Sequence, residues 1–284
     1  MSQINKISII IPVFNEAATV NNLLETVYNQ ELPHSFSKEM IIVESNSKDN
    51  TREIVKKFVE KKRNQKGSNT EVHLILQDAA KGKGSAAREG LAMASGDICL
   101  IQDGDLEYDI ADYPILIEPI VQGHADFVLG SRHLSAGSWK IRKFNQSPIK
   151  STVYNFGGAF FHWFFNFVYR VKLTDPTTMF KVFRTTCIQN VKFESNRFDF
   201  DFELVAKLVR LGFIPLEVPV SYRSRSHTEG KKVSLLRDPW TYLYAIIKFR
   251  ITRIQRIPRL VAQKQNQEII SRKFVATDQN SYNA

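Results

Sequence analysis

The first 110 residues alternate between short apolar runs and segments with helical spacing. Continuous apolar runs of strand length lie at 6–13, 40–45, 72–77 and 96–103. Between the first two runs, apolar residues recur three and four positions apart, at Val20, Leu23, Leu24 and Val27. Strands that are apolar throughout and separated by helices are typical of a parallel sheet covered on both faces. The pattern therefore predicts an α/β fold.

The second half of the chain is less regular. Residues 127–130 and 178–184 have the composition of strands, and 150–170 form a long aromatic stretch with helical character. The segment 197–213 begins with alternating acidic and aromatic residues and continues as a helix. A late strand near 215–226 contains Pro215 and Pro219, which places it at a sheet edge because proline cannot donate a ladder hydrogen bond.

The segment 238–260 combines aromatic and basic residues, including Trp240, Tyr244, Lys248 and Arg250, and predicts an amphipathic helix. Such a helix suits an anionic lipid surface, with aromatic rings at headgroup depth. A helix packed on the main domain is the equal alternative. The longest uncharged stretch, 151–169, is too short and too polar to predict a membrane span. The N-terminus predicts a strand, not a signal peptide.

Composition narrows the class of protein. Of 284 residues, 43% are hydrophobic and 24% are charged, which is ordinary for a globular chain. The formal net charge of +10 favours an anionic partner, such as nucleic acid, a lipid surface or a phosphorylated substrate. Cys99 and Cys187 show no metal-binding spacing and are expected to be core thiols of a reduced, cytosolic protein.

Acidic residues gather after the fourth apolar run, in the segment 102–109 (QDGDLEYD). Asp103 and Asp105 flank Gly104, so both carboxylates can face one point. Two carboxylates with few other protein ligands suit Mg²⁺ or Mn²⁺ shared with substrate phosphates, and Glu107 could add a ligand. Ligands of parallel sheets bind beyond the carboxyl ends of the strands. This rule places 12–16, 44–49 and 103–109 along one rim.

A glycine-rich segment, Lys81-Gly82-Lys83-Gly84, lies at the start of a predicted helix. Exposed backbone N–H groups and the helix dipole favour anion binding there. The segment lacks the Walker A pattern. A basic solvent loop is the plain alternative, above all for Lys81.

Several motifs occur together in this order: IIPVFNE at 10–16, VESNSKDNT at 43–51, KGKGSAAREGLAMASGD at 81–97 and QDGDLEYD at 102–109. The chain thereby resembles the family 2 glycosyltransferases. GSRH at 130–133, DPTTMFKVFR at 175–184 and EGKKVS at 229–234 resemble the polyprenyl-phosphate branch, which is similar to dolichol-phosphate mannose synthase. The resemblance covers Ile7 to about Arg250.

The resemblance implies a GT-A fold, a Rossmann-like, mixed and mostly parallel sheet flanked by helices. We expect a catalytic domain at 1–225, a basic and aromatic helical segment at 226–260 that faces the acceptor or the membrane, and a mobile polar tail at 261–284. It also implies a nucleotide-sugar donor, linked to UDP or GDP. The donor residues implied are Pro12, Asn15, Glu16, Glu44, Asp49, Lys81, Gly82, Asp103, Gly104 and Asp105. Glu44-Ser45 departs from the two adjacent acids common in the family.

The expected reaction is metal-dependent glycosyl transfer, with the inversion that the family implies, to a polyprenyl phosphate or a related membrane-linked glycan precursor. A phosphate acceptor is ionised near neutral pH and needs cations, not a base. The planar guanidinium group of arginine can donate two parallel hydrogen bonds to phosphate oxygens. The candidate acceptor cations are Arg132, Arg223, Arg225, Lys231 and Lys232.

Other functions stay open at this point. A sugar hydroxyl of a surface polysaccharide, as the acceptor, would need a general base, for which Asp201 and Asp199 are candidates. A nucleic-acid-binding module would use the basic run 56–66, but this run lacks interleaved aromatic residues. A nucleotidyltransferase would carry a glycine-rich signature near the N-terminus that is missing. We expect a cytoplasmic protein, peripheral on the inner face of the cytoplasmic membrane if its C-terminal helix binds lipid.

Overall fold

The computed structural model describes residues 4–63, 65, 68–138, 141, 148–224 and 238–256. Within these ranges the chain forms a seven-stranded sheet with the order β3-β2-β1-β4-β6-β5-β7. The strands are β1 (Lys6–Val13), β2 (Ser37–Glu44), β3 (Thr70–Leu76), β4 (Ile98–Ile101), β5 (Phe127–Ser131), β6 (Lys181–Arg184) and β7 (Leu216–Pro219). The four apolar runs of the first half are therefore confirmed as strands.

The sheet is mixed and mostly parallel, as expected. β1 pairs in parallel with β2 and β4, and β5 pairs in parallel with β7. β6 runs antiparallel between β4 and β5, with Ile101 opposite Lys181. β7 lies at the edge of the sheet, which confirms the position that its prolines predicted.

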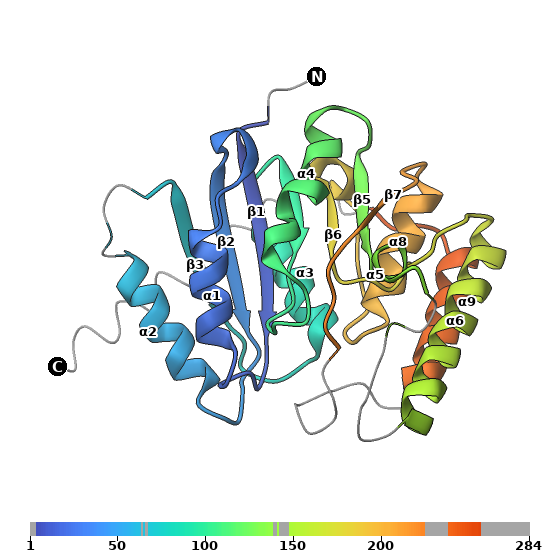
Figure 1. Ribbon diagram of the computed structural model, residues 1–284, viewed down its shortest axis with the longest axis horizontal. Helices are drawn as coiled ribbons and strands as arrows, with labels where there is room; N and C mark the ends of the chain where they lie inside the picture. The colour runs from blue at the N-terminus through green and yellow to red at the C-terminus, as the bar shows by residue number, and fades with distance from the viewer. Residues whose placement is uncertain are drawn as a thin grey trace.

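Helices cover both faces of the sheet (Figure 1). α1 (Val20–Asn29) and α2 (Thr51–Arg63) lie on one face of the first half, and α3 (Lys83–Met93) lies on the other against β1 and β2. α4 (Tyr113–Val121) packs against β5 and β6, and α8 (Phe200–Arg210) contacts α3. The short elements are η1 (Pro33–Ser35), η2 (Ile110–Asp112), α5 (Arg132–Ala136) and α7 (Thr185–Ile188). The core is built from the apolar strands, with Ile9, Ile10 and Leu100 fully buried.

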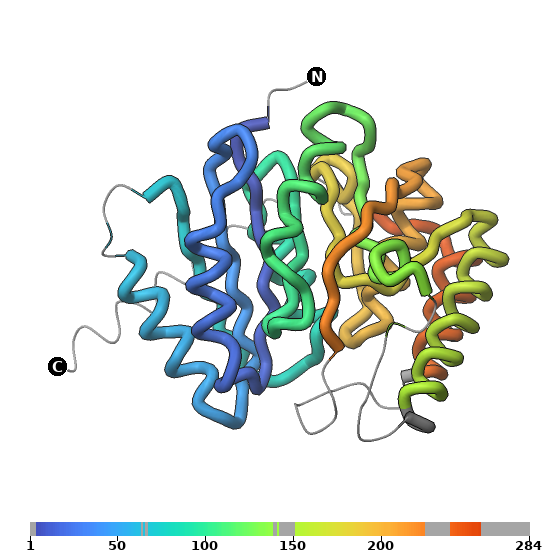
Figure 2. Tube along the Cα trace, in the orientation of Figure 1, coloured from blue at the N-terminus to red at the C-terminus, as the bar shows by residue number. Residues whose placement is uncertain are grey.

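Two long helices stand together beyond the β7 edge, α6 (Pro148–Tyr169) and α9 (Asp238–Ile251). They pack against each other and against α8, and the tube trace shows the same pairing on one side of the molecule (Figure 2). Phe165, Ala245 and Phe249 are buried in this contact. Within the described residues, no helix combines the length and the apolar character needed to cross a bilayer.

The C-terminal helix is shorter than its sequence predicts. α9 ends at Ile251, so Arg253 and Arg256 lie beyond it. Arg210 Nη1 donates to Phe249 O and, at 2.7 Å, to Thr252 O, which satisfies carbonyls at the helix end. The boundary at 225 and the tail at 261–284 fall outside the described residues and stay predictions.

Candidate active site

One cavity of about 730 Å³ opens at the carboxyl ends of β1, β2, β4 and β5. Ten of the predicted site residues line it, together with Lys83 and with apolar side chains of α6, α8 and α9. These ten are Pro12, Glu16, Lys81, Gly82, Asp103, Gly104, Asp105, Glu107, Arg132 and Asp201. The rim predicted from strand order is therefore a real hollow in the fold.

The acidic turn after β4 is held tightly against β1. Gln102 N donates to Ile10 O at 2.9 Å and extends the pairing of β4 with β1. A Cβ on Gly104 would come within 2.8 Å of Pro12 O, so only glycine lets the turn pass the end of β1. Asp103 and Asp105 consequently line the same cavity, and Asp105 is 8% exposed.

Lys83, at the start of α3, faces this acidic pair. Its ammonium forms an ion pair with Asp103 Oδ1. Burial lowers the pKa of Lys83, but the charges of Asp103, Asp201 and Asp105 outweigh it and raise the pKa above its usual value. Lys83 is therefore a fixed positive charge among carboxylates of the cavity.

The donor set suits a hard divalent cation. Asp103 already holds a cation, the Lys83 ammonium, and carboxylate oxygens are the ligands that Mg²⁺ and Mn²⁺ prefer. Asp105 Oδ1 accepts from Glu107 N at 3.0 Å, which fixes that carboxylate in the turn. Glu107 Oε2 accepts from Tyr222 OH at 3.0 Å. Metal ligation by Asp103, Asp105 and Glu107 stays a prediction.

The glycine-rich loop before α3 is shaped by its contact with the segment before α8. Gly82 has φ +106°, and a Cβ there would lie 2.5 Å from Asn196 O. Ser85 N donates to the same carbonyl at 3.1 Å. Lys81 is exposed at the cavity, whereas Lys83 reaches into it. The anion-binding role of the loop stays a prediction.

The loop after β1 and the loop after β2 are joined by hydrogen bonds. Glu16 N donates to Thr51 Oγ1 at 2.8 Å, and Asn15 Oδ1 accepts from Lys48 N at 2.8 Å. Pro12 and Glu16 line the cavity, but Asn15 is not among the described residues that do so. The contact of Asn15 with a nucleoside stays a prediction.

Glu44 and Asp49 are not among the described residues that line the cavity. Glu44 is fully buried; its Oε1 accepts from Ser47 N at 2.7 Å, and its Oε2 pairs with Arg52 Nε. Asp49 accepts from Ala17 N at 3.1 Å and from Thr51 N at 3.0 Å. Burial opposes its charged form, but the hydrogen bond from the Thr51 hydroxyl, together with these backbone hydrogen bonds, outweighs burial and lowers the pKa of Asp49. Both carboxylates order the loops here, and nucleoside binding by them stays a prediction.

Arg132 follows β5 and is anchored on Asp175. Its Nε lies 2.6 Å from Asp175 Oδ2 and its Nη2 lies 2.7 Å from Asp175 Oδ1. Arg132 Nη2 also donates to Thr177 Oγ1 at 3.2 Å. Burial opposes the charge of Asp175, but Arg132 outweighs it and holds the pKa of this carboxyl far below its usual range. Of the five guanidinium protons, those on Nη1 donate to no described residue, and Arg132 lines the cavity.

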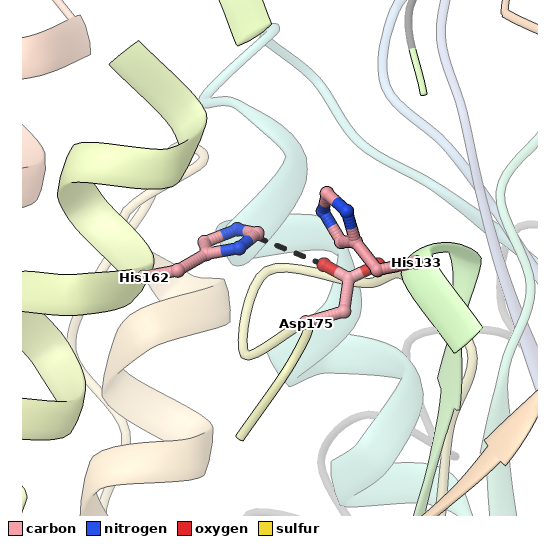
Figure 3. Close-up of side chains that lie close together, drawn as sticks. All are labelled: His133, His162 and Asp175. Carbon is pink, nitrogen blue, oxygen red and sulfur yellow. Dashed lines mark ion pairs between the residues drawn. The ribbon is translucent and has the colours of Figure 1, made fainter. Parts of the chain in front are cut away.

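Two histidines flank this pair (Figure 3). His162 comes from α6 and His133 from α5, and His162 Nε2 lies 3.8 Å from Asp175 Oδ1. The three residues bring potential ligand atoms within 4.8 Å of one another. Both Asp175 oxygens already accept from Arg132, however, and its positive charge would repel a metal ion. We therefore interpret the cluster as support for Arg132.

Asp201 lines the cavity and is paired with a lysine of the core. Lys181 Nζ lies 2.9 Å from Asp201 Oδ1, and Lys181 is fully buried. Burial lowers the pKa of Lys181, and the charge of Asp201 only partly offsets this. Asp199 lies outside the cavity lining and accepts from Arg197 N at 3.0 Å. The role of either carboxylate as a base stays a prediction.

The remaining acceptor cations are only partly placed. Arg223 is exposed, and its backbone N donates to Glu107 O at 2.8 Å. Arg225, Lys231 and Lys232 lie outside the described residues. Of the two cations of this group that the structure describes, Arg132 lines the cavity and Arg223 does not.

Comparison with known proteins agrees with this geometry. The family model described as glycosyl transferase family 2 matches residues 8–189. The chain belongs to this family. The match includes most of β1 and all of β2 to β6, but not β7. It also includes the acidic turn and Arg132.

Relatives of this family 2 chain include a "Dolichol-phosphate mannosyltransferase" from Pyrococcus furiosus, 26% identical over 251 residues, covering 86% of this chain and 64% of the relative. A "Dodecaprenyl-phosphate galacturonate synthase" from Rhizobium johnstonii is 25% identical over 229 residues, covering 80% of this chain and 61% of the relative. The chain thus spans less than two thirds of the length of both relatives.

The fold is also similar to that of a solved glucosyl-3-phosphoglycerate synthase from Mycobacterium tuberculosis in complex with uridine diphosphate. The TM-score is 0.58 at 15% identity, covering 87% of this chain and 80% of that chain. This likeness confirms the GT-A fold expected from the motifs.

Sequence reasoning missed the partners of the charged residues in this family 2 site. Asp175 and Lys181 both lie inside the motif 175–184, but their roles as partners of Arg132 and Asp201 depend on contacts 43 and 20 residues apart. The sequence offered only a general indication of these partners, because a buried charge in a folded chain needs an opposite charge nearby. Arg132 Cζ also lies 5.1 Å from the centroid of the Tyr222 ring. Nothing in the sequence indicated this contact.

Proposed function

We propose that this chain is a metal-dependent, inverting glycosyltransferase that moves a sugar from a nucleotide-sugar to a polyprenyl phosphate. One observation carries the proposal. A single cavity contains the carboxylates of Asp103 and Asp105, the anchored guanidinium of Arg132, and an apolar wall from α6 and α9. A metal-bound diphosphate, an acceptor phosphate and an apolar chain are the ligands that this combination suits.

At the donor end, Asp103 and Asp105 would hold Mg²⁺ or Mn²⁺. When bound, the cation would neutralise charge on the departing nucleoside diphosphate. Lys83, whose ammonium is paired with Asp103, would supply a second positive charge beside it. Pro12 and Glu16 line the cavity at the end of β1, where the nucleoside would lie.

At the acceptor end, Arg132 would bind the phosphate through Nη1. Asp175 fixes the guanidinium through Nε and Nη2, so the remaining donors keep one direction. The phosphate needs no base to become a nucleophile, since it is ionised near neutral pH. A sugar hydroxyl would need one, and Asp201 is the carboxylate of the cavity nearest to that role. One oxygen of Asp201 is already paired with the buried Lys181 ammonium, at 2.9 Å.

The outer face of α6 and α9 supports attachment to a membrane surface. Large apolar side chains are exposed there, with Trp163 61% and Trp240 73% accessible. Phe156, Phe167 and Tyr244 are similarly exposed, and the two helices lie side by side at one edge of the molecule (Figure 1). Tryptophan and tyrosine favour the headgroup region. We propose that this face rests on the anionic inner surface of the cytoplasmic membrane.

Sedimentation with vesicles of phosphatidylglycerol and phosphatidylcholine tests the membrane contact. The wild-type chain should pellet with anionic vesicles at low salt, and binding should weaken as salt rises. Trp163→Ser combined with Trp240→Ser should reduce the bound fraction several-fold. Equal pelleting by the double variant would rule out this face as the contact.

Calorimetric titration tests the donor site. UDP, GDP and their sugar conjugates are titrated with and without Mn²⁺ into the wild-type chain, Asp105→Asn and Asp109→Asn. Asp109 is the matched control because it lies in the same segment, is exposed and caps η2 through Ala111 N at 3.0 Å. We expect metal-dependent binding of one nucleotide, lost only in Asp105→Asn. A folded protein that binds none of these nucleotides would refute the proposed function.

A further inference from the structure

Two adjacent glycines, Gly157 and Gly158, lie in the middle of the 22-residue helix α6. Glycine is the least favourable residue for a helix interior after proline, because it loses the most conformational freedom on folding. A pair of them in one turn weakens the helix at a place where any other side chain would strengthen it. The surroundings of the helix should therefore explain why two glycines occur at this place.

Elsewhere in the chain, glycine is required by close packing. An added Cβ would come within 2.6 Å of a neighbouring atom at Gly84, 2.5 Å at Gly90 and 2.7 Å at Gly130. At Gly157, by contrast, an added Cβ would meet no described atom within 4 Å. Gly157 and Gly158 both line the cavity. Among the described residues, the missing side chain of Gly157 therefore leaves open space in the cavity wall instead of admitting another part of the protein.

The wall around this space is apolar. Tyr154 and Phe161 flank the two glycines on α6, and Phe202 and Tyr242 face the cavity from α8 and α9. We call Gly157 and Gly158 with these four rings the glycine notch. The rings contact one another, with centroids 5.4 Å apart for Phe161 and Tyr242 and 5.3 Å apart for Phe202 and Tyr242. Apart from the hydroxyls of Tyr154 and Tyr242, this wall consists of aromatic carbon, which suits an apolar group better than a charged one.

The notch is connected to the proposed phosphate site at one end. His162, next to Phe161 on α6, has its Nε2 2.9 Å from Thr177 Oγ1, and this hydroxyl accepts from Arg132 Nη2 at 3.2 Å. At the other end, Val153 lines the cavity and is 52% exposed. From Phe161 to Val153 the wall runs about 12 Å along α6, at about 1.5 Å per residue. The notch thus leads from Arg132 to the exposed apolar face of α6.

We propose that the glycine notch is the binding site for the apolar isoprenoid chain of the acceptor, next to its phosphate. The inference rests on the proposed function, because it takes the phosphate at Arg132 as its fixed end. The occupant is an isoprenoid chain because the wall is apolar and aromatic, open at Gly157 and continuous with the phosphate site. The absent side chain at Gly157 sets the width available to that chain.

The test compares two acceptors that differ only in chain length, geranylgeranyl phosphate and isopentenyl phosphate. Binding is measured by calorimetry and transfer by initial rates, with the wild-type chain, Gly157→Leu, Gly157→Ala and Ala159→Leu. Ala159 is the matched control because it lies on α6 but does not line the cavity. Gly157→Ala adds one methyl group into open space, so it should fold at least as well as the wild type.

We expect Gly157→Leu to weaken binding of the long-chain phosphate at least ten-fold and to leave the short-chain phosphate within two-fold of the wild type. Gly157→Ala should show a smaller loss in the same direction, and Ala159→Leu should show none. Long-chain binding unchanged in both Gly157 variants would overturn the inference, as would a wild-type chain with no preference for the long chain. Tight long-chain binding without sugar transfer would support the notch and refute the proposed reaction.

Discussion

Lys181 Nζ lies 2.9 Å from Asp201 Oδ1, so a carboxylate of the cavity wall is backed by a lysine that is fully buried in the core. Removing one partner of a buried ion pair leaves the other charge uncompensated, which costs about 3–5 kcal/mol. We expect Lys181→Met and Asp201→Asn each to lower the free energy of unfolding by about that amount. The double variant should lose less than the sum of the two.

Urea unfolding followed by circular dichroism measures these changes. Lys56 and Glu53, an exposed pair with 3.0 Å between Nζ and Oε1, supply the control. Lys56→Met and Glu53→Gln should each change the free energy of unfolding by less than about 1 kcal/mol. Strictly additive losses at Lys181 and Asp201 would contradict their coupling.

Arg132→Lys should impair the acceptor and spare the donor. Lysine keeps the positive charge but cannot reproduce the fork that Arg132 forms with Asp175. A charged hydrogen bond contributes about 1.5–3 kcal/mol, so we expect a roughly ten-fold to hundred-fold loss in kcat/KM for a prenyl phosphate. Nucleotide affinity should stay unchanged. Arg223→Lys, at an exposed position, should have the smaller effect, and the reverse order would contradict the assignment of Arg132.

Lys83→Met should strengthen metal binding by the protein without nucleotide. The ammonium of Lys83 occupies Asp103, and its positive charge repels a cation at the acidic pair. We expect Mn²⁺ affinity, measured by electron paramagnetic resonance, to rise about ten-fold, which corresponds to about 1.4 kcal/mol. Lys81→Met, which removes an exposed lysine of the same loop, should leave it nearly unchanged. Weaker Mn²⁺ binding in Lys83→Met would show that Lys83 supports the metal site.

Both cysteines should resist alkylation in the native protein. Burial raises the pKa of the Cys99 thiol and of the Cys187 thiol to about 12 each, so very little thiolate forms at pH 8. We expect iodoacetamide to modify neither thiol in native buffer at pH 8 and both in urea. Mass spectrometry counts the adducts. Rapid native modification of Cys99 would show that β4 opens far more readily than its burial implies.

The features that could be predicted from the sequence are those that depend on residues close together along the chain. The apolar strands β1, β2 and β4 follow from local pattern, and the acidic turn is visible because Asp103 and Asp105 are two positions apart. The antiparallel placement of β6 does not follow from periodicity, because strands of either direction show the same apolar run. The length of α9 was also overestimated, since its end depends on Arg210 of another helix.

The residues of the candidate site also fall into two groups, those that local sequence predicts and those that depend on distant contacts. Arg132 was found from its place after a strand, but its anchor Asp175 lies 43 residues further along and becomes visible only in the folded chain. Glu44, by contrast, ends β2 and is buried, and Asp49 lies in the exposed turn that follows; both accept hydrogen bonds that hold loops, and neither lines the cavity. Position at a strand end therefore predicts nearness to the cavity, whereas the direction of each side chain depends on partners that are distant in the sequence.

The reversed strand β6 brings the two ends of the proposed site to one rim of the sheet. Because β6 runs against its neighbours, its first residue, Lys181, lies beside the last residue of β4, Ile101. The segment that precedes it, which carries Asp175 and Thr177, is thereby delivered to the same rim as the acidic turn. Changes in 175–179 would therefore reach both ends of the proposed site, since Met179 N also donates to Tyr108 OH, in the acidic segment 102–109, at 3.0 Å.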